Sequence, residues 1–268
     1  MLEIVIGAKQ VMTNVDILTA LLQFKENFEV DIAVQEDTLF RRNKRLIVFD
    51  ADMTFLQCEV IDELGKLAGV GNQLADITDR AMGGEIDFTS ALKQRVALLK
   101  GLTVSQLEQL YENLPLTPGA AELVRILQHL NYKVAIVSGG FQFFISRLKE
   151  KYRLDHGFAN QLQIQEGRVT GEVEGEIIDA QAKAKILAFL AEKEGLSLQQ
   201  VVAVGDGAND IHMLAKAGLG IAFNAKPIVQ QHAQASISIY NLELILYFLG
   251  ISGNELKELR KAMKKPDS

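Results

Sequence analysis

The chain has 268 residues, of which 48% are hydrophobic and 23% are charged, a composition typical of a globular protein with one sizeable core. Its formal net charge of −6 argues against nucleic acid or an anionic membrane as the main partner. The only cysteine, Cys58, excludes an intramolecular disulfide, and no apolar stretch approaches the roughly 20 residues of a membrane-spanning helix. Without a basic and apolar leader at the N-terminus, the sequence predicts a cytoplasmic protein.

Residues 1–43 are predicted to form a short βαβ-like extension. Leu2–Gly7 and residues 28–34 have strand patterns, and Val15–Phe24 carries a helical stripe. A piece of this length is too short to bury a core, so it should dock on the main domain or on a second copy, as in a homodimer. The basic run Arg41–Arg45 is interpreted as a solvated linker rather than a nucleic-acid site, because the protein is acidic.

The stretch Leu46–Phe49 is the element around which the rest of the chain is organised. Its continuous apolar, partly β-branched residues are typical of a strand buried in a parallel sheet. The strand ends in Asp50, and Asp52 and Thr54 follow. A carboxylate at the mouth of a buried strand is costly unless a metal or another cation balances it. An isolated D-x-D would more often be a solvated turn, so the assignment depends on the remaining segments.

A helical pattern runs from Glu59 to about Gly101, and a helical cap is predicted over about residues 57–115. An insert directly after the central strand lies above the carboxyl end of the sheet, where open α/β sheets bind ligands. Alternation of strands and helices then resumes, interrupted by a predicted β-hairpin within residues 158–178. The expected fold is therefore α/β, with a Rossmann-like parallel core over residues 44–250 and a solvated helical tail over 251–268.

Three further polar groups follow predicted strand ends or begin a helix. They are the Ser138-Gly139-Gly140 run, Lys183, and the cluster of Asp206, Asn209 and Asp210. In a parallel sheet all strand ends of this kind meet at one edge. Carboxylates with one lysine, one hydroxyl and glycine-rich backbone suit a phosphate bound beside Mg²⁺. The sequence thus predicts a phosphate and magnesium site.

The segments FDADMT, VSGGF, Lys183 and GDGAND, in that order, resemble the four motifs of the haloacid-dehalogenase-like (HAD-like) phosphatases. The segments DRAMGGEIDFTSALKQRVALLKGL and VAVGDGANDIHMLAKAGLGIAFNAKP resemble the members that hydrolyse O-phospho-L-serine, and the likeness runs from about Val30 to about Leu244. The resemblance implies a HAD-like fold and Mg²⁺-dependent hydrolysis of O-phospho-L-serine through an aspartyl phosphate, the last step of serine synthesis. It also implies that residues 1–43 are part of an ACT-like ligand-binding domain.

The resemblance implies roles for the four polar groups. Asp50 would be the nucleophile, and Asp52 the general acid and base. Mg²⁺ would be held by Asp50, the backbone carbonyl of Asp52 and the side chain of Asp206, with support from Asp210. The phosphate would be held by a set of residues at the sheet edge, namely Ser138, Gly139, Gly140, Lys183 and Asn209.

In the cap, the resemblance implies that Glu59 and Arg95 bind the amino and carboxylate groups of the substrate. Met82 and Phe88 would close over it, although both could also be plain helix-packing residues. The chain departs from the family pattern at Met53, where Ser or Gly is usual, and at Ala51, where a bulkier residue is usual.

Other functions remain open at this point. Another small phosphomonoester such as phosphohomoserine could be the substrate, whereas Glu59 and Arg95 disfavour phosphocholine, which has no carboxylate. A phosphomutase or transfer to an acceptor alcohol is a weaker alternative. A non-enzymatic amino-acid sensor would leave the intact Asp50, Asp52, Lys183 and Asp206 without a purpose.

Overall fold

The computed structural model describes residues 31, 33, 35 and 38–263, so most of the predicted extension over residues 1–43 lies outside the described residues. The described part contains a seven-stranded sheet with the strand order β4-β3-β2-β1-β5-β6-β7. All neighbouring strands are parallel except β3 and β4. The predicted α/β fold with a parallel core is confirmed. The strands are β1 (Leu46–Phe49), β2 (Lys133–Phe141), β3 (His156–Gln165), β4 (Arg168–Glu174), β5 (Val201–Gly205), β6 (Leu219–Phe223) and β7 (Ala235–Ile237).

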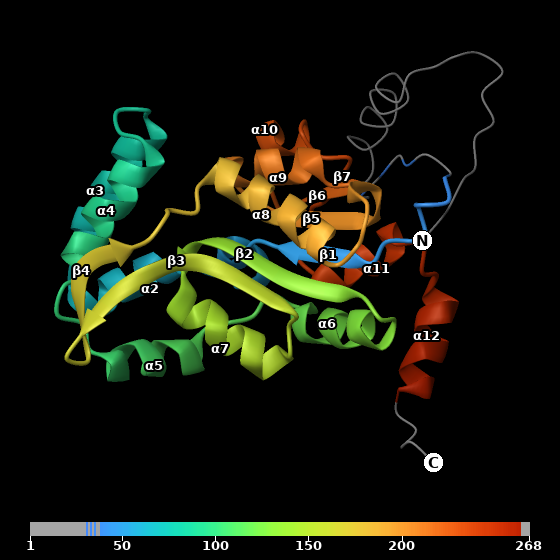
Figure 1. Cartoon of the computed structure of the whole chain (residues 1–268), viewed down its shortest axis with the longest axis horizontal. Coiled ribbons are helices and arrows are strands. Elements are labelled where there is room, and N and C mark those ends of the chain that lie inside the picture. Colours follow the sequence, from blue (N-terminus) through green and yellow to red (C-terminus); the bar gives the residue numbers. More distant parts are fainter. Residues whose placement is uncertain (1–30, 32, 34, 36–37, 264–268) are drawn as a thin grey trace.

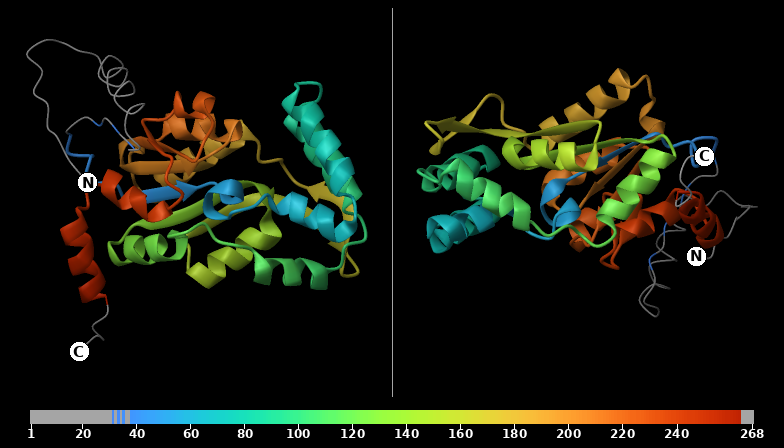
Figure 2. Two further views of the ribbon diagram at one scale, coloured as in Figure 1. Left: turned by 180° about the vertical axis from the view of Figure 1, so that it is seen from behind. Right: turned by 90° about the horizontal axis from the view of Figure 1, so that it is seen from below.

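Helices cover both faces of the sheet, as Figures 1 and 2 show. Leu46 and Val48 of β1 pack into a cluster that includes residues of α8 and α9, whereas Ile47 and Phe49 pack against residues of α6 and α7. All four side chains are fully buried. This two-sided burial is the physical reason for an unbroken apolar run. The core helices are α6 (Ala120–His129), α7 (Gln142–Tyr152), α8 (Ala180–Lys193), α9 (Ile211–Lys216), α10 (Pro227–Gln230) and α11 (Ile245–Phe248).

The cap lies at one end of the molecule, and α12 lies at the other (Figure 1). The helices of the cap are α2 (Val60–Ala68), α3 (Gly71–Met82), α4 (Phe88–Leu98) and α5 (Val104–Asn113). The two chain segments that join it to the core run side by side. Leu56 forms an isolated antiparallel bridge with Leu116, and the Gln57 N–H donates to the Pro115 carbonyl at 2.9 Å. Because both connections are hydrogen-bonded, the base of the cap is fixed above the strand ends.

The predicted hairpin is confirmed, but it is not a separate insertion. Its first strand is the continuation of β3, which pairs in parallel with β2 before it turns into antiparallel pairing with β4. The strand β4 packs on α4, and the Gly101 N–H donates to the Val169 carbonyl at 2.8 Å. The hairpin therefore supports the cap from a core strand.

The interpretation of the basic run as a solvated linker is wrong at Lys44, which is 3% exposed. Its Nζ donates to the Gln199 carbonyl at 2.7 Å and to the Gly218 carbonyl at 3.1 Å. Burial lowers the pKa of this lysine. The two carbonyls come from segments far away in the sequence, so a local pattern could not reveal them.

The tail is helical over α12 (Gly253–Ala262), but it is not fully solvated. Leu256 is buried, and the Arg260 Nη2 pairs with Glu243 at 2.5 Å. Near the other terminus, Ala33 forms an isolated antiparallel bridge with Ala235 of β7. No helix in the described part of the chain is long and apolar enough to cross a membrane.

Candidate active site

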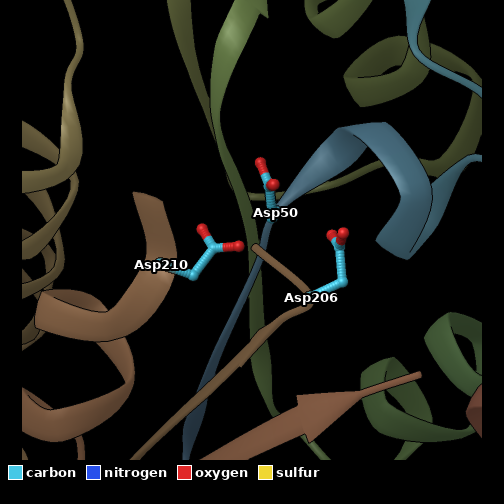
Figure 3. Close-up of side chains that lie close together, drawn as sticks. All are labelled: Asp50, Asp206 and Asp210. Atoms are coloured by element: carbon cyan, nitrogen blue, oxygen red, sulfur yellow. The ribbon is translucent and has the colours of Figure 1, made fainter. Parts of the chain in front are cut away.

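The carboxyl ends of β1 and β5 place three aspartates around one point, as Figure 3 shows. Asp50 follows β1 directly, and Asp206 and Asp210 follow β5. The Lys183 Nζ, from the first turn of α8, lies 2.7 Å from Asp50 Oδ1 and 2.8 Å from Asp210 Oδ1. Lys183 and Asp210 are completely buried and Asp50 is nearly so. The predicted convergence of these distant residues at one sheet edge is present.

The three aspartates each offer a carboxylate oxygen within 4.8 Å of the other two, so they could hold a metal ion. Burial and the charge of Asp210 raise the pKa of Asp50 well above its usual value. Burial and Asp210 likewise raise the pKa of Asp206 to about 7. Burial disfavours a charge on Lys183, but Asp210 and Asp50 outweigh it and raise the pKa of this lysine. One lysine does not balance three crowded carboxylates, and a bound divalent cation would.

Asp52 lies in the turn after β1, and its carboxylate is not one of the three that come together as a candidate metal site. Its Oδ1 accepts a hydrogen bond from the Val60 N–H, the first residue of α2, at 3.0 Å. Burial, followed by the charge of Glu59, raises the pKa of Asp52 to about 7. Its side chain lines the same cleft as the cap residues Glu59 and Arg95.

The same turn holds Met53, which departs from the pattern implied by the resemblance, in a backbone conformation that favours glycine. Met53 has a φ of 56°, in the left-handed region that glycine adopts freely. A residue with a Cβ pays about 1–2 kcal/mol there. The turn is closed by the Leu56 N–H, which donates to the Ala51 carbonyl at 2.8 Å, and Thr54 Oγ1 donates to Asp206 Oδ1 at 2.8 Å. Thr54 thus orients a candidate metal ligand, a role that the sequence did not reveal.

The run Ser138-Gly139-Gly140 at the end of β2 faces Asp52. The Gly140 N–H donates to Ser138 Oγ at 2.8 Å. A Cβ added to Gly140 would lie 2.8 Å from Asp52 Oδ2 and 3.1 Å from Ser138 Oγ. Only glycine at this position leaves the space between these two oxygens open.

The cap contributes groups of both charges to the same cleft. Glu59 is the N-cap residue of α2, and Arg95 lies in the last turn of α4. The Arg95 Nε is buried without a hydrogen-bond partner among the described residues. Burial and Asp62 raise the pKa of Glu59, although Arg95 opposes this. The ring of Phe88 lies above Gly139, because a Cβ added there would lie 3.1 Å from its Cζ.

Most of the predicted site residues line one cleft, and Ser138, Lys183 and Asp210 are buried next to its walls. Met82 is different: at the end of α3 it is 70% exposed and does not line the cleft. Its contact with the substrate stays a prediction. The sequence analysis did not single out four further lining residues, Ile61, Leu92, Phe141 and Gly207, although Phe141 and Gly207 lie within the segments VSGGF and GDGAND. The cleft is lined by Asp50, Asp52, Glu59, Ile61, Phe88, Leu92, Arg95, Gly139, Gly140, Phe141, Asp206, Gly207 and Asn209.

Residues 47–215 match the family model of the haloacid dehalogenase-like hydrolases. The chain therefore belongs to the haloacid dehalogenase-like hydrolase family.

Its curated relatives carry a more specific name. A phosphoserine phosphatase of Archaeoglobus fulgidus is 55% identical over 217 residues, which are 81% of this chain and 63% of the relative. A phosphoserine phosphatase of Methanocaldococcus jannaschii is 44% identical, over 78% of this chain and 99% of the relative. A solved phospho-aspartyl intermediate analogue of phosphoserine phosphatase superposes with a TM-score of 0.71 at 45% identity, covering 76% of this chain and 99% of that one. The chain spans only 58–63% of the length of the first three curated relatives.

Proposed function

We propose that this protein is a Mg²⁺-dependent phosphatase that hydrolyses O-phospho-L-serine to L-serine and phosphate. The observation that carries the choice of substrate is the buried Arg95 Nε, which has no hydrogen-bond partner among the described residues and lies in the same cleft as Glu59. A buried guanidinium N–H without an acceptor is costly, and an α-carboxylate would supply the acceptor. Glu59 would bind the α-amino group. The names of the relatives, phosphoserine phosphatase, support the same choice.

In the proposed reaction the Asp50 carboxylate attacks phosphorus, and the bond between phosphorus and the serine oxygen breaks. Asp50 Oδ1 already accepts from the Ala51 N–H at 2.7 Å and pairs with Lys183. These contacts fix the carboxylate, and the charge of Lys183 stabilises the transferring phosphoryl group. The Ser138 hydroxyl, buried next to the cleft, and the backbone of Gly139, which lines it, would hold the phosphoryl oxygens.

Asp52 would donate its proton to the leaving serine oxygen, because serine alkoxide is a poor leaving group. As a carboxylate it would then take a proton from the water that attacks the aspartyl phosphate, so that phosphate and free Asp50 are regenerated. Its Oδ1 is held by the Val60 N–H, which leaves Oδ2, beside Gly140, to exchange the proton.

Mg²⁺ fits the donors present, because hard carboxylate oxygens are the ligands that it prefers. We propose that Asp50 and Asp206 hold it with their side chains and Asp52 with its backbone carbonyl, while Asp210 and Asn209 support the site. Bound there, the cation would offset the repulsion between the carboxylates and the phosphate dianion.

The direct test is phosphate release from O-phospho-L-serine in Mg²⁺ and in EDTA. Phosphohomoserine and phosphocholine serve as comparison substrates. The proposal is supported if phosphate release requires the metal and is faster from phosphoserine than from either comparison substrate. A preference for phosphohomoserine would leave the chemistry and change the substrate, and no release from any of them would favour an amino-acid sensor.

We also propose that the enzyme acts in the cytoplasm and that residues 1–43 are a partly ACT-like N-terminal extension. A homodimer through that extension is the accompanying prediction. Light scattering after size-exclusion chromatography, with and without L-serine, tests whether two copies associate.

A further inference from the structure

The pairing of β2 with β3 is interrupted where the proposed phosphate-binding run lies. Val137 pairs with Phe158, and the next pair is Phe141 with Asn160. Three residues of β2, Ser138 to Gly140, therefore face a single residue of β3, Ala159. An irregularity of this kind removes regular ladder partners from backbone groups, which then need other partners.

Asn160 supplies one of these partners. It is 1% exposed, and its Nδ2 donates to the Gly139 carbonyl at 2.8 Å. Its Oδ1 accepts from the Ile178 N–H at 2.7 Å. Ile178 lies in the segment that leads into α8, which carries Lys183. One buried amide thus joins the end of β2 to the segment before the catalytic lysine.

The contact fixes a single peptide group. The Gly139 carbonyl and the Gly140 N–H belong to the same planar peptide unit. The carbonyl accepts from Asn160, and the N–H donates to Ser138 Oγ. Because Ser138 Oγ accepts at this point, its own proton must point elsewhere, and it remains available as a donor.

We propose that Asn160 is a positioning residue for phosphoryl binding. It holds the Gly139–Gly140 peptide in the orientation that occupies a lone pair of Ser138 and so directs the Ser138 hydroxyl proton to the substrate phosphate. This inference rests on the proposed function, because it assigns the bound group to that site. Neither strand pattern nor motif marks Asn160 in the sequence.

The test is a double-mutant cycle between Asn160 and Ser138. Asn160→Asp keeps an acceptor for the Ile178 N–H and removes the donor to Gly139, while Asn160→Ala removes both without adding a charge. We expect each to lower kcat/KM for phosphoserine about 10- to 100-fold, the usual range for losing a partner that orients a site residue. In a Ser138→Ala background the same changes should cost no more than about twofold, because the residue they orient is gone.

The matched control is Gln142→Leu. Gln142 lies at the same irregularity, where its Oε1 accepts from the Ala159 N–H at 2.8 Å, but none of its side-chain hydrogen bonds to described residues involves the Gly139–Gly140 peptide. We expect it to lower Tm while kcat/KM stays within about twofold. Equal activity losses in the Gln142 and Asn160 variants, or additive losses in the cycle, would overturn the proposal.

A binding measurement separates this inference from the proposed function. Calorimetric titration with inorganic phosphate, in the presence of Mg²⁺, needs no turnover. Asn160→Ala should weaken phosphate binding, and the same substitution should have no effect on binding in the Ser138→Ala background. This result supports the positioning role even if phosphoserine is not the substrate. Unchanged phosphate binding in Asn160→Ala contradicts the role even if the wild-type enzyme hydrolyses phosphoserine.

Discussion

The edge of the core sheet and the cap differ in how they hold their functional side chains. At the sheet edge, Asp50, Lys183 and Asp210 are buried, and the Lys183 Nζ lies within 2.8 Å of both carboxylates. In the cap, Glu59 and Arg95 have no ion pair between them within 4.0 Å among the described residues. The core groups are paired with each other through Lys183, whereas Glu59 and Arg95 are not paired with each other.

We interpret this difference as a division of tasks, in which the sheet edge carries out the proposed reaction and the cap selects the substrate. Groups that must meet a developing charge are most effective when the protein has fixed them in advance. Groups that select the substrate need a hydrogen-bond or charge partner only from the correct substrate. With a wrong substrate they stay unpaired, which is costly. We therefore expect substitutions at the sheet edge to affect every substrate, and substitutions in the cap to affect phosphoserine alone.

The largest expected effect comes from the two aspartates of the first motif. Asp50→Asn removes the nucleophile and should lower kcat by about 10⁶-fold, the loss found when a covalent nucleophile is removed. Asp52→Asn removes only the acid and base and should cost about 10²–10⁴-fold.

Mass spectrometry distinguishes the two roles. An acyl phosphate needs no proton on its leaving group, so acetyl phosphate should still load Asp50 in the Asp52→Asn variant. The phosphate adduct should then accumulate, because no base activates water, and it should be absent from Asp50→Asn. An adduct in Asp50→Asn but not in Asp52→Asn would reverse the assignment.

Removal of the metal should have the next largest effect. We expect EDTA to abolish phosphate release from phosphoserine and from a simple aryl phosphate alike, because both present the same dianion to Asp50 and Asp206. Mg²⁺ should restore activity, and Ca²⁺ should not, since it prefers more ligands at longer distances. Full activity in EDTA would contradict the metal assignment.

Arg95→Ala should separate the cap from the core. We expect a loss of about 2–5 kcal/mol in kcat/KM for phosphoserine, the range for breaking a buried charge pair. An aryl phosphate, which has no carboxylate, should be hydrolysed nearly as well as by the wild type. Lys93→Ala, exposed on the same helix, is the matched control. Equal losses on both substrates would make Arg95 a structural residue.

The smallest effect concerns the contact between the cap and the core. The Arg147 Nε of α7 donates to Glu108 of α5 at 2.7 Å, and its guanidinium lies 3.4 Å from the centre of the Phe143 ring. Because the pair is partly exposed, Arg147→Ala should lower the free energy of unfolding by only about 1 kcal/mol. Urea denaturation measures this, with exposed Lys149→Ala as control. A loss of several kcal/mol would show that the cap and the core depend on this contact to fold.

The sequence by itself determined the sheet and the order of the catalytic groups. Two-sided burial required the unbroken apolar run of β1, and each polar group follows a strand end or begins a helix. Because carboxyl ends of parallel strands share one edge, Asp50, Lys183 and Asp206 had to converge once the fold was known. Local patterns suffice for such features, since the topology places the side chains.

Only the tertiary structure decided which side chains act through distant partners. Lys44 reads as a solvated charge but donates to two carbonyls, and Asn160 sits in an ordinary strand but holds the Gly139 carbonyl. Met82 belongs to a recognisable segment, yet its side chain lies outside the cleft. A hydrogen bond between residues far apart in the chain produces no periodic pattern in the sequence. The packing of whole helices and strands brings its two partners together, and no short segment of the sequence contains both of them.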